Sequence, residues 1–181
     1  MGFALAALTL GAVAEPSDVH FMSAMILHHA QAVLMAGWAP THDASPAVLT
    51  LCARIAVSQR DEIDLMARWL TDHHVAVPDT SVAMTDQALM PGMLTTAQLA
   101  QLDSARGTDF DHLFLTDMIR HHQGAVAMVN ELLTAPGAAQ DNLVYQLATD
   151  VSAGQMAEIA RMRGLLAALP PRSSPPVPKR P

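Results

Sequence analysis

The stretch DHLFLTDMIRHHQGAVAM, residues Asp111 to Met128, decides the fold because the chain contains it twice. The other copy, Asp18 to Met35, reads DVHFMSAMILHHAQAVLM, and nine of the eighteen aligned positions are identical at a constant offset of 93 residues. Both copies carry two adjacent histidines in the middle of an apolar segment with helical spacing. Such a repeat indicates that the histidines of the two copies share one task.

The duplication continues into the segment that follows each pair of histidines. The pattern Gln-x-x-Glu-Ile-x-x-Met-x-x-x-Leu occurs at residues 59–70 and again at 155–166, an offset of 96 residues. The two offsets differ by three residues, and turns of unequal length absorb this difference. The chain therefore consists of two related helical hairpins, each with a histidine helix followed by a glutamine-glutamate helix.

Start and stop signals predict where the helices lie. Caps at Ser17, Ser45 and Thr108 begin long helices that end near residues 37, 73 and 134, where glycine and proline or the end of the periodic pattern stops them. A fourth long helix is predicted over about 138–169, before two prolines. Thr95 and Gln98 form a capping box that predicts a short helix ending at about residue 107.

These segments predict an all-α fold, a ferritin-like four-helix bundle made from two duplicated hairpins. Neither hairpin can bury its apolar face alone, so the two pack together with approximate twofold symmetry. Repeat one covers 17–74, a long crossover connection with the short extra helix covers 75–107, and repeat two covers 108–169. The bundle domain spans 15–170, and the proline-rich tail 171–181 is predicted to be disordered.

Residues 1–14 contain an apolar run that is too short to span a bilayer. Ala12, Val13 and Ala14 form a small-x-small cleavage pattern before Glu15. The segment is therefore interpreted as a signal-peptide remnant that lacks its positive start, or as an N-terminal apolar helix. The first interpretation predicts a periplasmic or secreted protein, and no stable membrane span is expected.

Charge and cysteine content narrow the range of functions. The 181-residue chain has a net charge of -7 and a single lysine, Lys179, so a phosphate-binding surface and a nucleic-acid partner are not expected. Cys52 is the only cysteine, which excludes an intrachain disulfide and a cysteine-based zinc cluster. Twelve methionines and nine histidines remain as the abundant residues that could bind a metal.

The repeated residues of each histidine helix fall within an arc of about 120°. Adjacent residues diverge by about 100°, so the two histidines flank the centre of this face, with a methionine one turn earlier. A glutamate on the apolar face of the following helix needs a polar partner, which the histidines of the same repeat can supply. The predicted metal-site residues are Met25, His28, His29, Glu62, Met66, Met118, His121, His122, Glu158 and Met162.

Imidazole and thioether groups favour copper as the bound ion. Cu(I) is the preferred form, Cu(II) bound through histidine is the second choice, and zinc or iron is less suitable. The competing explanation is structural: histidine–glutamate hydrogen bonds without metal, and methionines that only fill the core. Met84, Met90 and Met93 of the connection are interpreted either as a capture loop for Cu(I) or as apolar anchors.

The run from Gly107 to Ala125 strongly resembles the family catalogued as domain of unknown function 305. The sequence Met-Pro-Gly-Met at 90–93 and the later Gln155-x-x-Glu158-Ile159 match it too, and the resemblance covers about residues 17–169. It implies a ferritin-like fold and export, and some members are periplasmic copper-binding proteins associated with copper tolerance.

Carried over residue by residue, the resemblance implicates Met118, His121 and His122, together with their counterparts in the first repeat. The first repeat departs from the family pattern at Ala30-Gln31, where the second has Gln123-Gly124. A glycine at that point is expected to let a neighbouring helix approach closely.

The leading hypothesis is an extracytoplasmic copper-binding protein that buffers or transfers the metal, or confers copper tolerance, without catalysis. Its expected partners are the metal ion and copper-transfer proteins, and the sequence predicts no oligomeric state. One alternative is a ferritin-like di-metal oxidase, although such sites usually contain Glu-x-x-His motifs, which this chain lacks. The other is a metal-free helical interaction module whose polar core sets the helix register.

Overall fold

A computed structural model describes residues 14–86 and 90–171. The predicted disordered tail beyond residue 171 and the apolar segment before Ala14 lie outside the described residues. Five α-helices are present in the described ranges, which contain no strand, so the predicted all-α fold is confirmed. They are α1 (Pro16–Trp38), α2 (Pro46–Asp72), α3 (Thr96–Ser104), α4 (Gly107–Thr134) and α5 (Asn142–Ala168), with short 3-10 helices η1 (Ala39–Thr41) and η2 (Thr80–Met84).

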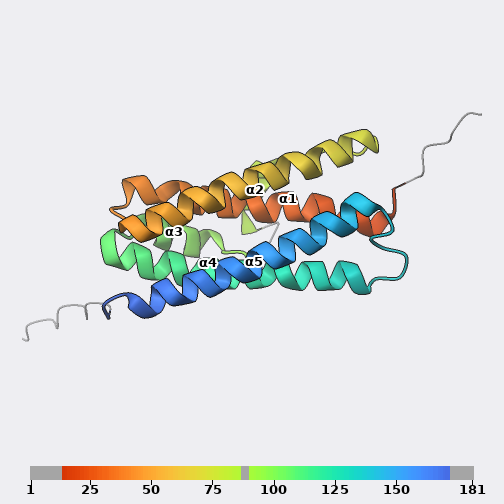
Figure 1. Cartoon of the computed structure of the whole chain (residues 1–181). Coiled ribbons are helices and arrows are strands. Elements are labelled where there is room, and N and C mark those ends of the chain that lie inside the picture. The colour runs from red at the N-terminus through yellow and green to blue at the C-terminus, as the bar shows by residue number, and fades with distance from the viewer. Residues whose placement is uncertain (1–13, 87–89, 172–181) are drawn as a thin grey trace, which may run out of the picture.

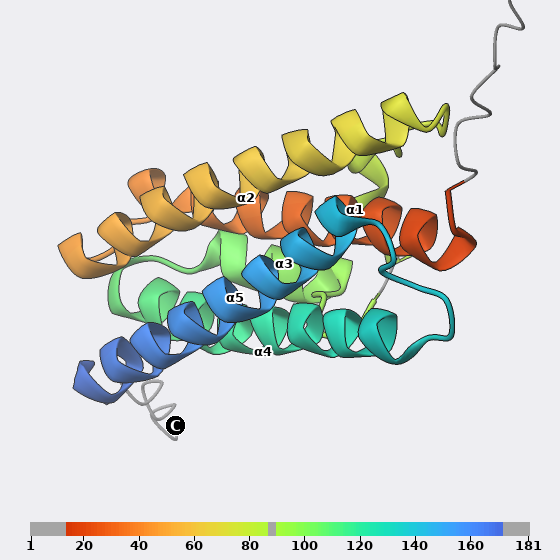
Figure 2. The same ribbon diagram turned by 45° about the vertical axis from the view of Figure 1, so that its right-hand side comes forward.

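The four long helices form two antiparallel hairpins that pack against each other (Figures 1 and 2). Helices α1 and α2 make the first hairpin, and α4 and α5 make the second. The connection runs from the end of α2 back along the bundle to the start of α4 and carries η2 and α3 on the way (Figure 1). Helix α3 packs against both α1 and α4.

Two of the predicted helix starts are formed by the predicted caps. The side chain of Ser45 accepts a hydrogen bond from the backbone N–H of Val48 at the start of α2. Thr95 and Gln98 form the capping box of α3, with both reciprocal bonds present. Local side-chain chemistry therefore places these two starts.

The caps predicted at Ser17 and Thr108 are wrong. Helix α1 begins one residue before Ser17, at a proline whose fixed φ suits the first helical position, and α4 begins at Gly107, both without a side-chain cap. Helix α5 starts four residues later than predicted. Ala139 has a positive φ of 53°, which interrupts the helical path, and Asp141 then caps α5 by accepting two backbone bonds.

The core consists of two apolar clusters separated by polar side chains. One cluster includes Ala32, Met35 and Ala36 of α1 and Phe114, Leu115 and Met118 of α4. The other includes Phe21, Met22, Ala24, Met25 and Ile26 of α1 and Ala125, Met128 and Val129 of α4. Between the clusters every long helix presents polar residues near its middle. We call these residues the polar layer: His28, His29, Gln31, Gln59, His121, His122 and Gln155, which are buried, and Glu62 and Glu158, which are half-buried.

Asp18 and Asp111, equivalent residues of the two repeats, tie the hairpins together reciprocally. Asp18 of α1 accepts a 2.7 Å hydrogen bond from the N–H of Ala139 in the turn between α4 and α5. Asp111 of α4 accepts bonds of 3.2 and 3.3 Å from the N–H of Ser45 at the start of α2. Both carboxyl groups are buried, so opening either end of the bundle breaks a buried polar contact.

The connection passes beside the polar layer and is held differently by the two repeats. The Gln31 amide donates to the carbonyls of Ala83 and Leu94 at 3.0 Å and accepts from the N–H of Leu94 at 2.7 Å. Its counterpart is Gly124, where an added Cβ would lie 1.8 Å from the carbonyl oxygen of Pro91. The expectation that this glycine admits a neighbouring helix is wrong, because the backbone of the connection occupies that space.

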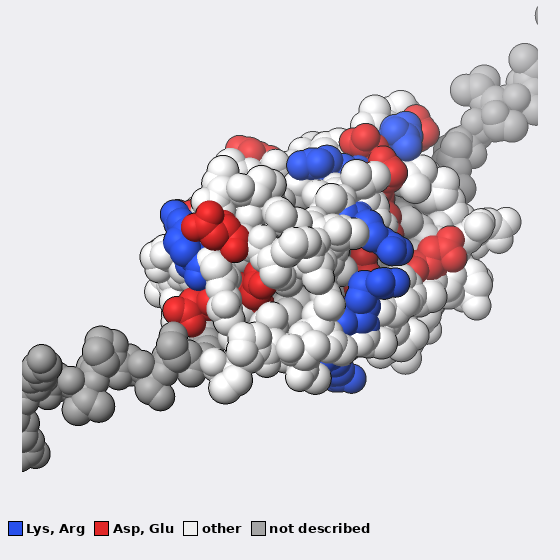
Figure 3. All heavy atoms as spheres, turned by 60° about the vertical axis from the view of Figure 1, so that its left-hand side comes forward, with Lys and Arg blue, Asp and Glu red and all other residues white. Residues whose placement is uncertain are grey.

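Among the described helices, α1 with its extension to Thr41 is the one that is long and apolar enough to cross a membrane by length and composition alone. In the bundle 56% of the tested window is buried, so the structure uses this apolar surface as core. On the face drawn in Figure 3, basic and acidic side chains are interspersed.

Replacing Gly124 by alanine is expected to lower the free energy of unfolding by ~3 kcal/mol or more, because the new methyl group collides with the backbone of Pro91. Gly154→Ala in α5 is the matched control. There an added Cβ meets nothing within 4 Å, and loss of glycine from a helix should raise stability by ~0.5–1 kcal/mol. Urea unfolding followed by circular dichroism compares the two. Equal stability of both variants would contradict the packing of the connection on α4.

Candidate metal centre

The four histidines of the two repeats lie together in the polar layer. Helix α1 contributes His28 and His29, α4 contributes His121 and His122, and all four are 0% exposed. The rings of His28 and His121 meet across the bundle, with centroids 3.8 Å apart and planes inclined by 40°. The other two rings lie 6.4 and 6.2 Å from their sequence neighbours. Each repeat therefore supplies one inner and one outer imidazole.

The outer imidazoles bond to the glutamates of the following helices. The Nε2 atom of His29 lies 2.7 Å from Oε2 of Glu62, and the Nε2 atom of His122 lies 2.7 Å from Oε2 of Glu158. The carboxylate side chains are 20% and 22% exposed, so they reach from the surface into the polar layer. The predicted pairing of a glutamate with a histidine of its own repeat is confirmed as a hydrogen bond, but the glutamates are half-buried and not buried as predicted.

The inner imidazoles have unequal surroundings. Nε2 of His28 lies 3.0 Å from the carbonyl oxygen of Pro91 in the connection. Neither ring nitrogen of His121 has a hydrogen-bond partner among the described residues. The two repeats therefore differ at the inner pair, because the single connection bonds to one of its members.

Burial favours the neutral form of His28, His121 and His122. The pKa of His28 is lowered to about 3, first because burial removes the ring from water and second because His29 is close. Burial also lowers the pKa of His121 well below its ordinary value, and the neighbouring histidines lower it further. The pKa of His122 is lowered by burial against the opposing effect of Glu158. A neutral ring is the form that can bind a metal ion.

Eight buried nitrogen and oxygen atoms of the polar layer have no hydrogen-bond partner among the described residues. Five are ring nitrogens, namely Nδ1 of all four histidines and Nε2 of His121, and three are amide atoms of Gln59 and Gln155. Leaving such an atom unpaired costs ~1–3 kcal/mol. A bound metal ion or ordered water can supply the missing partners. Uncharged nitrogen donors at the centre of a buried layer fit copper.

The methionines predicted as ligands are all fully buried, but they lie in different parts of the core. Met25 and Met66 belong to one apolar cluster, and Met118 and Met162 belong to the other. Within the described residues, no three histidine, cysteine or acidic side chains are grouped closely enough to hold a metal ion as they stand. Binding a metal between the two repeats therefore requires the ligand side chains to move closer together.

The connection places its three methionines in different surroundings. Met93 is buried, whereas Met84 and Met90 are half-buried, and Met90 packs against the cluster that contains Met25. Met84 lines a surface hollow with Trp38 and Asp103. These positions agree with the role of apolar anchors, and the role of a capture loop stays a prediction.

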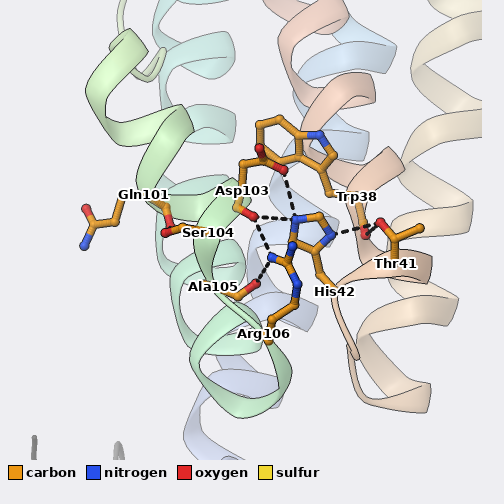
Figure 4. Close-up of polar contacts among 8 residues, drawn as sticks. All are labelled: Trp38, Thr41, His42, Gln101, Asp103, Ser104, Ala105 and Arg106. Atoms are coloured by element: carbon orange, nitrogen blue, oxygen red, sulfur yellow. Dashed lines mark hydrogen bonds and ion pairs between the residues drawn. The ribbon is translucent and has the colours of Figure 1, made fainter.

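Sequence reasoning missed His42, which is buried between η1 and the end of α3. Its Nε2 lies 2.8 Å from the carbonyl oxygen of Asp103 and 3.0 Å from a carboxylate oxygen of the same residue, and Nδ1 lies 3.0 Å from Oγ1 of Thr41 (Figure 4). Its ring also stacks on Trp38. The counterpart of His42 in the second repeat is Ala135, so comparing the two repeats did not mark His42 as important. Because both ring nitrogens have partners, His42 joins η1 to α3.

Comparisons with known proteins agree with this fold. The sequence profile described as "Domain of unknown function (DUF305)" matches residues 18–171. A DUF305 fragment from Deinococcus radiodurans is 31% identical, with a TM-score of 0.73, over 86% of this chain and 99% of that one. A protein from Streptomyces coelicolor described as "putative secreted protein DUF305" is 28% identical, with a TM-score of 0.73, over 83% and 92%.

CopM has been solved in Cu(I)-bound and Cu(II)-bound forms. The two structures are 28% identical to this chain, with TM-scores of 0.66 and 0.67, over 83% of this chain and 95% of theirs. Among curated proteins, none matches the chain. Because the family profile covers nearly the whole described bundle, the chain belongs to the DUF305 family.

Proposed function

We propose that this protein binds copper in its polar layer and acts outside the cytoplasm as a copper buffer or carrier, without catalysing a reaction. The observation that carries the proposal is the set of buried ring nitrogens that have no hydrogen-bond partner among the described residues. The structural likeness to CopM, whose structures contain Cu(I) and Cu(II), supports copper as the ion.

The chemistry of the donors favours Cu(I) over harder ions. Neutral imidazoles and thioethers are borderline or soft ligands, and the apolar clusters on both sides of the layer contain fully buried methionines. Cu(II) is the second choice, held through the imidazoles, and zinc would use the same rings. Iron fits less well, because the layer contains two carboxylates, Glu62 and Glu158, and both bond to imidazoles.

An extracytoplasmic location is part of the proposal. The Streptomyces coelicolor neighbour carries the description "putative secreted protein". Residues 3–14 are apolar and end in a small-x-small pattern, as in a signal peptide. A copper buffer or carrier in that compartment would exchange the ion with copper-transfer proteins.

Two alternatives make different use of the same residues. A di-metal oxidase would need carboxylate ligands, but both glutamates of the layer are engaged with histidines. A metal-free interaction module accounts for the two histidine–glutamate bonds, but it leaves the Nδ1 atoms and His121 to be paired by water.

Changing His28, His29, His121 and His122 together to alanine is expected to abolish competition with a chromogenic chelator for Cu(I), because the imidazole donors are gone. The milder variant His121→Leu keeps the core filled and should weaken Cu(I) binding by at least about tenfold. The control is His20→Ala with His74→Ala, two exposed histidines outside the layer. Circular dichroism checks that each variant is folded. Equal copper uptake by wild type and by both layer variants would reject the proposal.

The metal-free protein is expected to lose stability as the pH falls from 7 to 5.5. The folded-state pKa of His28 is about 3 and that of His121 is also lowered, whereas an unfolded histidine has a pKa of about 6.5. The unfolded chain therefore binds more protons below pH 6.5, so the stability that is present above that pH is lost as the pH falls toward 3. Two such rings lower the free energy of unfolding by about 2–3 kcal/mol at pH 5.5.

Urea unfolding at pH 7 and pH 5.5 measures this difference. Asp and Glu side chains have ordinary pKa values of about 4, so most of the change in this interval comes from histidine. His121→Asn should reduce the difference by about 1 kcal/mol, and the exposed-site change His20→Asn should leave the contribution of the layer in place. Identical stability of the wild type at both pH values would contradict the burial of neutral rings.

A further inference from the structure

Three of the four imidazoles in the polar layer use the same ring nitrogen to bond to the protein. The Nε2 atoms of His29 and His122 each lie 2.7 Å from a glutamate oxygen, and Nε2 of His28 lies 3.0 Å from the carbonyl oxygen of Pro91. An ionised carboxylate and a backbone carbonyl can only accept hydrogen bonds. Each of these rings therefore donates from a protonated Nε2, and a neutral ring that donates in this way carries its lone pair on Nδ1.

The Nδ1 atoms of these same three rings are buried and have no hydrogen-bond partner among the described residues. The N–H group of each ring is thus occupied, while the buried Nδ1 atom has no partner among the described residues. The arrangement occurs in both repeats, each time with a glutamate from the following helix. Its recurrence shows that it is a property of the repeat and not of one contact.

We propose that His28, His29 and His122 bind copper through Nδ1, and that Glu62 and Glu158 are positioning residues and not ligands. This assignment rests on the proposed copper function. In a metal-binding imidazole, one ring nitrogen binds the ion and the other carries a proton. A carboxylate that accepts a hydrogen bond from this N–H group fixes the tautomer and orientation of the ring and increases its basicity. The assignment differs from the sequence-based prediction, in which both glutamates were metal ligands.

His121 differs from the other three rings because both of its nitrogens are unpaired among the described residues. Its counterpart in the first repeat, His28, bonds to the carbonyl of Pro91. The chain has one connection and therefore one such carbonyl, so His121 receives no equivalent acceptor. This ring can present either nitrogen to an ion.

¹⁵N NMR of the histidine rings in the metal-free protein at pH 7 tests the tautomers directly, because protonated and unprotonated ring nitrogens differ widely in chemical shift. The expected result is an Nε2–H tautomer for His28, His29 and His122. Cu(I) is diamagnetic, so the same spectra can be followed as it is added. The Nδ1 signals should shift while the Nε2 protons remain. Loss of the Nε2 protons with a shift at Nε2 would overturn the assignment.

Glu62→Leu and Glu158→Leu separate positioning from ligation, because leucine offers no acceptor to the Nε2–H group, whereas glutamine would keep one. Each change is expected to weaken Cu(I) binding by about 10–100-fold and, in the metal-free protein, to populate the Nδ1–H tautomer of the histidine that has lost its carboxylate. A purely structural role would not change the tautomer. Glu131→Leu, at an exposed position of α4, is the matched control and should change neither quantity. Unaltered tautomers in both layer variants would overturn the positioning role.

Failure of the copper function and failure of this assignment give different results. Absence of any Cu(I) uptake by the folded wild type would overturn both. Cu(I) uptake with the spectral shift at Nε2 would overturn only the assignment, and the proposed function would stand. Uptake with the shift at Nδ1 and weakened binding in the two leucine variants supports both.

Discussion

The fold depends on a layer of polar side chains that crosses the middle of an apolar core. All four long helices contribute to it near their centres, so the layer divides the core into two separate apolar clusters. Burying polar groups without partners is unfavourable by ~1–3 kcal/mol each, and the clusters on either side must supply the stability that the layer does not. The reciprocal bonds of Asp18 and Asp111 close the two ends of the bundle. Among the described residues, eight of the nine buried side-chain atoms without a hydrogen-bond partner therefore lie in this one layer, and the two aspartates pair with backbone N–H groups at both ends.

A duplicated chain with a single connection cannot keep its two halves equivalent. The connection lies beside the polar layer once, and the two repeats accommodate it with different residues at the same position. Gln31 holds the backbone by three hydrogen bonds, while Gly124 makes room for it. The same asymmetry gives His28 a carbonyl acceptor that His121 lacks. The departure from the repeat pattern at Ala30-Gln31 is therefore the consequence of a single connecting segment that packs against two similar helices.

Helical periodicity and the internal repeat were sufficient to predict the long helices and the pairing of a glutamate with each pair of histidines, because both follow from local spacing and from the cost of burying a charge. Other features depend on contacts that spacing does not contain. The start of α5 depends on the positive φ of Ala139, and the role of Gln31 depends on where the connection runs. Spacing placed both histidines of a repeat on one face, but the division into inner and outer rings required the geometry of the opposite hairpin.

The electrostatics of the layer explain how it could hold a cation reversibly. The pKa of His122 responds to both Glu158 and Glu62, as well as to His29, so the two histidine–glutamate pairs belong to one interacting unit. A cation bound by the neutral rings would place its charge inside this unit, where carboxylates that reach the surface can offset it through the imidazoles. Without an ion, His28 and His121 stay neutral because burial lowers the pKa of both rings. The layer thus resists protons by burial while keeping lone pairs available, which is the combination that a carrier of a soft ion requires.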